Sequence, residues 1–212
     1  MAWDCGTGNG QIAVELARHF QTVFATDISQ NQIHHAVQKK NITYKVEPAE
    51  HTSFADAMFD LVTVGQAIHW FDFERFYAEV DRTLKPRGIF AVTGYPLLTI
   101  DKQTDSIIQH FYEDIVGAYW DDERKYLDEH YRTIPFPYKE IAAPKFSAVY
   151  EWSLEQFIGY LHTWSAVQHY KERNGTNPVD TILNDLKTCW NGTRTKTATF
   201  PILLRIGIKS SG

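Results

Sequence analysis

The stretch Asp4–Gly10 reads DCGTGNG and precedes a run with helical spacing. Its glycines, Gly6, Gly8 and Gly10, are spaced G-x-G-x-G, whereas the loop typical of dinucleotide-binding proteins reads G-x-G-x-x-G. A helix N-terminus stabilises a pyrophosphate through its free N–H groups and dipole, and the carboxylate of Asp4 would repel such an anion. The loop therefore favours a cationic or zwitterionic ligand over NAD.

Length, composition and charge narrow the class of protein. The 212 residues, 43% of them hydrophobic, suffice for one domain with a sizeable core. The formal net charge is −5 and no block of like charges occurs, which disfavours a nucleic-acid partner. The two cysteines, Cys5 and Cys189, lack zinc-site or disulfide spacing, and no apolar run approaches the roughly 20 residues that span a bilayer. We expect a cytoplasmic protein without a metal site or a membrane partner.

Strand and helix patterns alternate through the first half of the chain. After the glycine loop, apolar residues recur every four positions, as on one face of a helix, and β-prone runs separate such segments. Ser29 with Gln32 is expected to start one further helix as a capping box, and Asp72 is expected to cap another. This alternation predicts an α/β protein with a parallel sheet and helices on both faces. The expected strands are Thr22–Thr26, Thr43–Val46, Phe59–Val64 and, after a turn at Lys85–Gly88, Ile89–Thr93.

The second half has a different pattern. Residues 96–145 form a long, aromatic-rich insertion, expected to be helical around Asp101–Tyr119 and irregular near Ile134–Pro137. We expect one domain over residues 1–212, with this insertion as a cap. The elements expected to follow are a strand at Phe146–Trp152, a capping box at Ser153 and Gln156, a helix from Asn177 to about Trp190, and a strand near Thr199–Ile208.

Five blocks together resemble a known family by their order and spacing. They are DCGTGNG, Asp27 after a strand, Ala49-Glu50, FDLVTVGQAIHWFD at Phe59–Asp72, and LKPRG at Leu84–Gly88. The chain resembles class I S-adenosylmethionine-dependent methyltransferases and is similar to their type-11 group; the HWFD block resembles the trans-aconitate methyltransferase branch. The resemblance implies a Rossmann-like, doubly wound sheet of seven mostly parallel strands with an antiparallel closing strand. It also implies S-adenosyl-L-methionine as the cofactor.

The resemblance assigns the nucleoside part of the cofactor to residues after the second and third strands. Asp27 is expected to accept both ribose hydroxyls, because a carboxylate can accept such a pair. Ile28 is expected to pack on the adenine, and Ala49 with Glu50 to meet its edge. Pro48 stands where relatives often have an aspartate, so adenine recognition is left to Ala49 and Glu50.

The methionine part of the cofactor is assigned to the glycine loop and to the end of the fourth strand. The loop is expected to let the backbone approach this part, with Asp4 oriented toward its amino end. Residues after the fourth strand are expected to line the methyl region. Besides Asp4, the residues assigned to the methionine part of the cofactor are Gly6, Gly8, Gly10, Gly65 and Gln66.

The same resemblance places His69 and Trp70 where open α/β sheets bind ligands. We assign both to the substrate pocket, together with the aromatic insertion, although a histidine there can equally be a hydrogen-bonded structural residue. If the acceptor is a carboxylate, it is already ionised at pH 7 and needs no base, so no catalytic residue is assigned. Arginines that could bind such an acid are Arg124, Arg132 and Arg173.

Three hypotheses for function remain. The first is methyl transfer to a small molecule, and the second is cofactor binding without turnover. The third, an NAD-dependent oxidoreductase, is disfavoured by the loop spacing and Asp4. Only three residues precede Asp4, whereas relatives usually carry further helices before this strand; we therefore expect these helices to be missing, which bears on the choice between the first two hypotheses.

Overall fold

The chain divides into two compact units in the computed structural model, which describes residues 1–211. The first unit comprises Met1–Tyr95, Glu129–Lys145 and the residues from 202 onward. The second comprises Pro96–Asp128 and Phe146–Pro201. The last part of the expected insertion, Glu129–Lys145, therefore belongs to the first unit, and the second unit extends well beyond residue 145.

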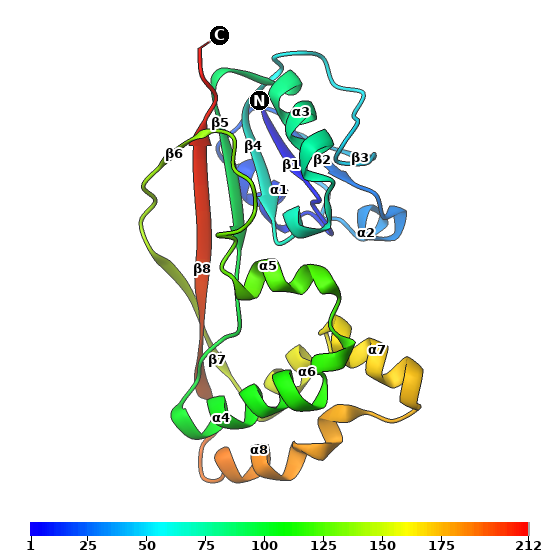
Figure 1. The fold of residues 1–212 in the computed structure, drawn as a ribbon, viewed down its shortest axis with the longest axis vertical. Coiled ribbons are helices and arrows are strands. Elements are labelled where there is room, and N and C mark those ends of the chain that lie inside the picture. The colour runs from blue at the N-terminus through cyan, green and yellow to red at the C-terminus, as the bar shows by residue number, and fades with distance from the viewer. Residues whose placement is uncertain (212) are drawn as a thin grey trace. The chain divides into compact units, whose positions relative to one another are not determined.

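Eight strands of the described residues form one mixed sheet in the order β3-β2-β1-β4-β5-β8-β6, and β7 also pairs with β8. The neighbours from β3 to β5 are parallel, whereas β8 runs antiparallel to β5 and β6 (Figure 1). The Rossmann-like fold with an antiparallel closing strand is confirmed. The expected number of strands, seven, was wrong by one, because the three-residue strand β6 is too short to show an alternating pattern. The strands are β1 Ala2–Cys5, β2 Val23–Asp27, β3 Ile42–Val46, β4 Phe59–Gly65, β5 Leu84–Gly94, β6 Lys139–Ile141, β7 Phe146–Trp152 and β8 Lys196–Ile208.

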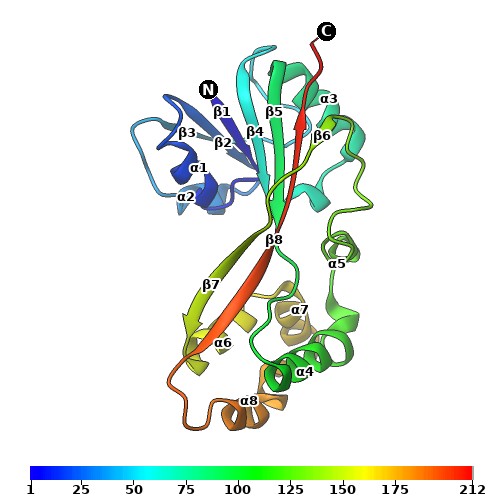
Figure 2. The same cartoon turned by 90° about the vertical axis from the view of Figure 1, so that its left-hand side faces the viewer.

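The helices of the first unit cover both faces of its sheet. Helices α1 and α3 lie on opposite faces, as a doubly wound fold requires (Figures 1 and 2). The Asp72 cap is confirmed, since its carboxylate accepts from the Arg75 amide. Of the capping box expected at Ser29, the structure shows one half, in which the Ser29 hydroxyl accepts from the Gln32 amide. The helices are α1 Gln11–Leu16, α2 Gln30–His34, the 3₁₀ turn η1 Ile68–Trp70 and α3 Phe73–Thr83.

The register of the parallel strands brings their carboxyl ends to one edge of the sheet. Cys5 at the end of β1 pairs with Thr26 of β2 on one side and Val64 of β4 on the other. Gly65 at the end of β4 pairs with Thr93 of β5. The loops that follow β1, β2, β4 and β5 therefore leave the sheet at the same edge, where open α/β sheets bind ligands.

The start of β5 departs from the expected turn. The ladder with β4 pairs Phe59 with Leu84 and then shifts, so that Leu61 pairs with Ile89. The residues Lys85–Gly88 lie inside β5 as an irregularity, with Arg87 at a left-handed φ of 63°. The proline, glycine and left-handed arginine interrupt the ladder here without ending the strand.

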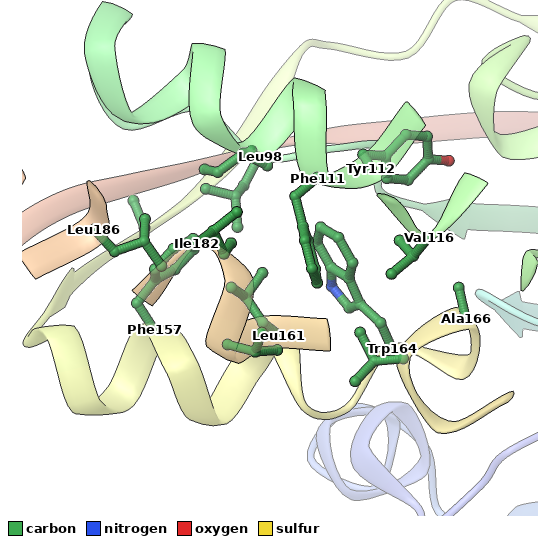
Figure 3. Packing of buried hydrophobic residues seen from close by; sticks show 14 of the residues in the cluster. Leu98, Phe111, Tyr112, Val116, Phe157, Leu161, Trp164, Ala166, Ile182 and Leu186 are labelled. Atoms are coloured by element: carbon green, nitrogen blue, oxygen red, sulfur yellow. The ribbon is translucent and has the colours of Figure 1, made fainter. Parts of the chain in front are cut away.

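The second unit has its own aromatic core. The Phe111 and Trp164 rings lie 5.9 Å apart at its centre, next to Leu161 and Val116 (Figure 3). The capping box at Ser153 is confirmed. The helix expected from Asn177 to Trp190 is instead a 3₁₀ turn followed by a separate α-helix. The helices and turns are α4 Lys102–His110, η2 Phe111–Ile115 (a π-helical turn), η3 Gly117–Tyr119, η4 Asp122–Arg124, α5 Lys125–Asp128, α6 Leu154–Leu161, α7 Ser165–Asn174, η5 Pro178–Thr181 and α8 Leu183–Cys189.

Candidate cofactor and acceptor site

The glycine loop between β1 and α1 has a left-handed backbone at Gly6, Gly8 and Gly10, with φ values of 64°, 57° and 87°. The surroundings of these glycines differ. A Cβ at Gly10 would lie 2.2 Å from the Tyr44 hydroxyl oxygen, whereas a Cβ at Gly8 would meet only Gln32 Oε1, at 4.0 Å. Gly10 therefore serves packing within the chain. Gly8 leaves open space above the loop, as close approach of a ligand to the backbone requires.

Asp4 lies beneath this loop, with 1% of its surface exposed. Its Oδ2 accepts from the Thr7 hydroxyl at 2.5 Å and the Ala13 amide at 3.0 Å, and its Oδ1 accepts from the Thr63 hydroxyl at 2.9 Å. Burial raises the pKa of Asp4 to about 6; the hydrogen bonds oppose this rise and the negative charge of Asp27 adds to it. The carboxylate thus ties the loop to α1 and β4 from below.

Asp27 joins the end of β2 to the same loop. Its Oδ2 accepts from the Gly8 amide at 2.8 Å, and its Oδ1 accepts from the Ser29 amide at 2.8 Å. Each carboxylate oxygen can accept two hydrogen bonds, so both oxygens keep capacity for a further donor. Ile28 follows with 77% of its surface exposed, as an apolar side chain beside this carboxylate.

The two residues expected at the adenine edge have different surroundings. Ala49 is buried. Glu50 is half-buried, and its Oε1 accepts from the Asp72 amide at 3.1 Å. Glu50 therefore connects the segment after β3 to the N-cap of α3.

Gly65 and Gln66 follow β4 at the same edge. A Cβ at Gly65 would lie 2.1 Å from Ile12 Cδ1, so the absence of a side chain lets α1 pack closely. Gln66 has a left-handed φ of 54°, which is uncommon for a residue other than glycine. Its side-chain amide accepts from the Tyr95 N–H at 2.8 Å and donates to the Tyr95 carbonyl at 3.3 Å. This pair of bonds locks the end of β4 to the end of β5.

The next residues along the chain, His69 and Trp70, differ in exposure. His69 has 6% of its surface exposed, whereas Trp70 has 54%, and their rings lie 5.0 Å apart. His69 Nδ1 lies 3.4 Å from the Tyr131 hydroxyl oxygen. Sequence reasoning assigned Tyr131 only to the insertion and missed this contact. The two residues are 62 positions apart, and no local pattern signals such a pair.

Of the arginines proposed to bind an acid, Arg124 is engaged within the second unit. Its guanidinium donates to the Tyr112 hydroxyl at 2.8 Å, lies 3.6 Å from Asp128 and stacks over the Trp120 ring at 4.7 Å. Arg124 is therefore a packing element of that unit.

The part of the chain that the structure describes offers no group of three or more His, Cys, Asp or Glu side chains suited to a metal ion. None of the described helices is long and apolar enough to cross a membrane. An open groove of about 590 Å³ lies between α4 and α8 in the second unit, apart from the residues above. It is lined by Lys102, Gln103, Ser106, Ile107, Asp185 and Thr188.

Known methyltransferases resemble this chain in sequence and in fold. The family Methyltransf_11, described as a methyltransferase domain, matches residues 3–92. A Dictyostelium discoideum protein named as a methyltransferase is 31% identical over 99% of this chain and 82% of its own length. A Saccharomyces cerevisiae protein named as an S-adenosylmethionine-dependent methyltransferase is 23% identical over 86% of this chain and 75% of its own length. A solved structure from Anaeromyxobacter dehalogenans, described as a type II methyltransferase, is 37% identical with a TM-score of 0.91, and the match covers 100% of this chain and 90% of that one.

Proposed function

Because the chain belongs to the class I S-adenosylmethionine-dependent methyltransferases, we propose that it methylates a small, carboxylate-bearing molecule at the strand-end edge of its first unit. The observation that carries the proposal is the open backbone at Gly8 beside the Asp27 carboxylate, which is already fixed 2.8 Å from that backbone. The family assignment removes the oxidoreductase hypothesis.

The nucleoside of the cofactor fits the residues around Asp27. Both carboxylate oxygens keep capacity for a donor, as two ribose hydroxyls require. The exposed Ile28 gives the adenine an apolar surface, and Ala49 with Glu50 lies after the neighbouring strand β3. These residues form the nucleoside side of the proposed site.

The methionine end of the cofactor fits the loop and the end of β4. Gly8 gives access to the backbone, and Gly65 with Gln66 stands at the adjoining strand end. Asp4 acts from beneath the loop, since its oxygens already accept from three groups of the chain. Its role is to hold the loop and to favour a cationic ligand through its charge.

Methyl transfer to a carboxylate requires little from the protein beyond positioning of the two reactants. The bound cofactor supplies a methyl group on a sulfonium, which is an activated leaving group. An acceptor carboxylate is ionised at pH 7, so no residue has to remove a proton from it. The chain then contributes by orienting the acceptor and by excluding water.

The acceptor side of the proposed site is the His69–Trp70 turn. Trp70 is half exposed and forms an apolar wall, and the adjacent imidazole of His69 adds a polar edge. An aromatic wall with one polar group suits a small organic acid that has an apolar body.

Two experiments test this function. Calorimetric titration should show binding of S-adenosylhomocysteine and none of NAD. A screen with methyl-labelled S-adenosylmethionine against small acids, phenols, amines and macromolecules should then label one or more acids. Methylation of macromolecules or neutral amines alone would remove the carboxylate proposal, and binding without labelling of any acceptor would refute turnover on small molecules.

A further inference from the structure

The segment from Glu129 to Tyr138 returns to the first unit in a strained conformation. His130 and Tyr131 are consecutive residues with left-handed backbones, at φ values of 55° and 57°. Residues with a Cβ avoid this region, and two in succession persist only where the surrounding structure imposes them. The contacts that impose this conformation are therefore informative about what the segment does.

Arg205 of β8 provides the main anchor. Its Nη1 donates to the carbonyl oxygens of Tyr131 at 2.8 Å and Ile134 at 2.9 Å. The guanidinium also forms a two-pronged pair with Glu140, at 2.9 and 3.0 Å, and lies 4.3 Å from the centre of the Phe136 ring. Hydrogen bonding to Arg205 lowers the pKa of Glu140, which keeps the pair charged. One planar side chain thus fixes both the start and the middle of the segment.

The anchored Tyr131 is fully buried, and its hydroxyl lies beside Gly94, the last residue of β5. It approaches His69 Nδ1 at 3.4 Å, and the two rings are nearly parallel, at 30°. A Cβ built at Gly94 would lie 2.7 Å from this hydroxyl and 2.9 Å from Gln66 Oε1. The hydroxyl is therefore close to residues that follow β4, where we place the methyl region.

We propose that Tyr131, held by Arg205, is a positioning residue for methyl transfer that fixes the imidazole of His69 on the acceptor side. A hydrogen bond at one ring nitrogen sets the tautomer and the orientation of an imidazole, and so determines what its other nitrogen presents. The nearly parallel tyrosine ring restrains the imidazole further. The inference rests on the proposed acceptor role of His69.

The chain offers a matched pair of tyrosines for the test. The Tyr77 hydroxyl of α3 donates to the Pro135 carbonyl, so it holds the same segment through a different residue. Tyr131→Phe and Tyr77→Phe each remove one hydroxyl from contacts of this segment. A merely structural role predicts similar effects of both, whereas positioning of His69 predicts an effect of Tyr131→Phe alone.

For Tyr131→Phe we expect kcat on the acceptor to fall by about three- to tenfold, the range that one hydrogen bond typically supplies. The affinity for S-adenosylhomocysteine should stay within about twofold, because the hydroxyl acts on the acceptor side. The ¹⁵N resonance of His69 Nδ1 should shift in Tyr131→Phe and stay in place in Tyr77→Phe. Arg205→Lys keeps the charge but lacks the planar fork. It should reproduce the fall in kcat and the shift of the His69 resonance seen with Tyr131→Phe.

An unchanged His69 resonance and an unchanged kcat in Tyr131→Phe would overturn the inference, as would equal losses in the two tyrosine variants. The His69 resonance can be measured without an acceptor. It therefore tests whether Tyr131 fixes His69 even if the acid screen labels nothing. A failed screen with a Tyr131-specific shift would refute the proposed acceptor class and retain Tyr131 as the residue that fixes His69. A successful screen with no shift of the His69 resonance and no change in kcat would retain the proposed acceptor class and refute the positioning role of Tyr131.

Discussion

The Gly8 amide donates to Asp27 Oδ2 at 2.8 Å, which joins the loop after β1 to the end of β2. Asp27 Oδ1 is held in turn by the Ser29 amide, so both oxygens of the carboxylate have fixed positions. A group that is already ordered loses less conformational freedom when a ligand binds. The ribose side of the proposed site is therefore preorganised by the backbone.

Replacing Asp27 tests this arrangement. Asp27→Ala should weaken S-adenosylhomocysteine binding at least tenfold, because losing a charged hydrogen-bonding partner typically costs about 1.5 to 3 kcal/mol. Asp27→Asn keeps one carbonyl oxygen, so its affinity for S-adenosylhomocysteine should lie between those of the unaltered protein and Asp27→Ala. Asp114→Ala removes an exposed acidic partner of His110 in the second unit and serves as the control in calorimetry. An unchanged dissociation constant in a folded Asp27→Ala protein would exclude the ribose assignment.

The two glycines of the loop should respond differently to the same substitution. Gly8→Ala places a Cβ in open space, so its effect on folding is limited to the left-handed backbone, about 1 to 2 kcal/mol. Its effect on cofactor affinity should exceed tenfold, because the methyl group occupies space that we assign to the ligand. Urea unfolding and calorimetry measure the two effects separately.

Gly10→Ala should instead destabilise the fold by more than Gly8→Ala, because its Cβ would collide with the Tyr44 side chain. Adding Tyr44→Phe removes the nearest atom, the hydroxyl, and should restore part of the lost stability. If the double variant gains nothing over Gly10→Ala, the collision is not the cause of the loss.

The buried Asp4 should make stability depend on pH. Its pKa is about 6 in the folded chain against a reference of 3.8, so the folded state binds the proton more tightly than the unfolded state. The contribution of Asp4 to stability therefore falls as pH rises through this window, by about 2 kcal/mol between pH 4.5 and pH 7. An asparagine at this position cannot ionise, so the stability of Asp4→Asn should lack this part of the dependence on pH.

Urea unfolding of both proteins at the two pH values gives the comparison. Asp4→Asn also alters the bonds to Thr7 and Thr63, so the absolute stability of the variant is not informative. The informative quantity is the difference between the two pH values, in which effects independent of pH cancel. Identical slopes would mean that Asp4 titrates near its ordinary pKa.

The sequence predicts those features of this fold that depend on local pattern. Ser29, Asp72 and Ser153 are recognisable as caps in the sequence because a side-chain oxygen and an amide three residues later form a local signal. The β7 bounds, Phe146–Trp152, agree with the expected strand for a similar reason, since β-prone and aromatic residues cluster there.

Other features depend on contacts that leave no local pattern. Asp4 is buried and accepts a hydrogen bond from Thr63, which lies 59 positions away, so a residue expected to face a ligand lies beneath the loop instead. The return of Glu129–Lys145 to the first unit depends on Arg205, which is 74 positions from the Tyr131 carbonyl that it binds. Neither partner could be identified from spacing, because the fold alone brings them together.

Replacing Trp70 distinguishes the acceptor side of the proposed site from its cofactor side. Its ring is half exposed, so Trp70→Ala should leave the fold intact, with a stability loss well below the 3 to 5 kcal/mol typical of a core tryptophan. Methyl transfer to the acceptor found in the screen should fall, while S-adenosylhomocysteine affinity stays within about threefold, because a residue that faces only the acceptor makes no contact with the cofactor. Steady-state kinetics with calorimetry on the same protein measures both. Equal losses of turnover and cofactor affinity would place Trp70 against the cofactor and would remove it from the acceptor wall.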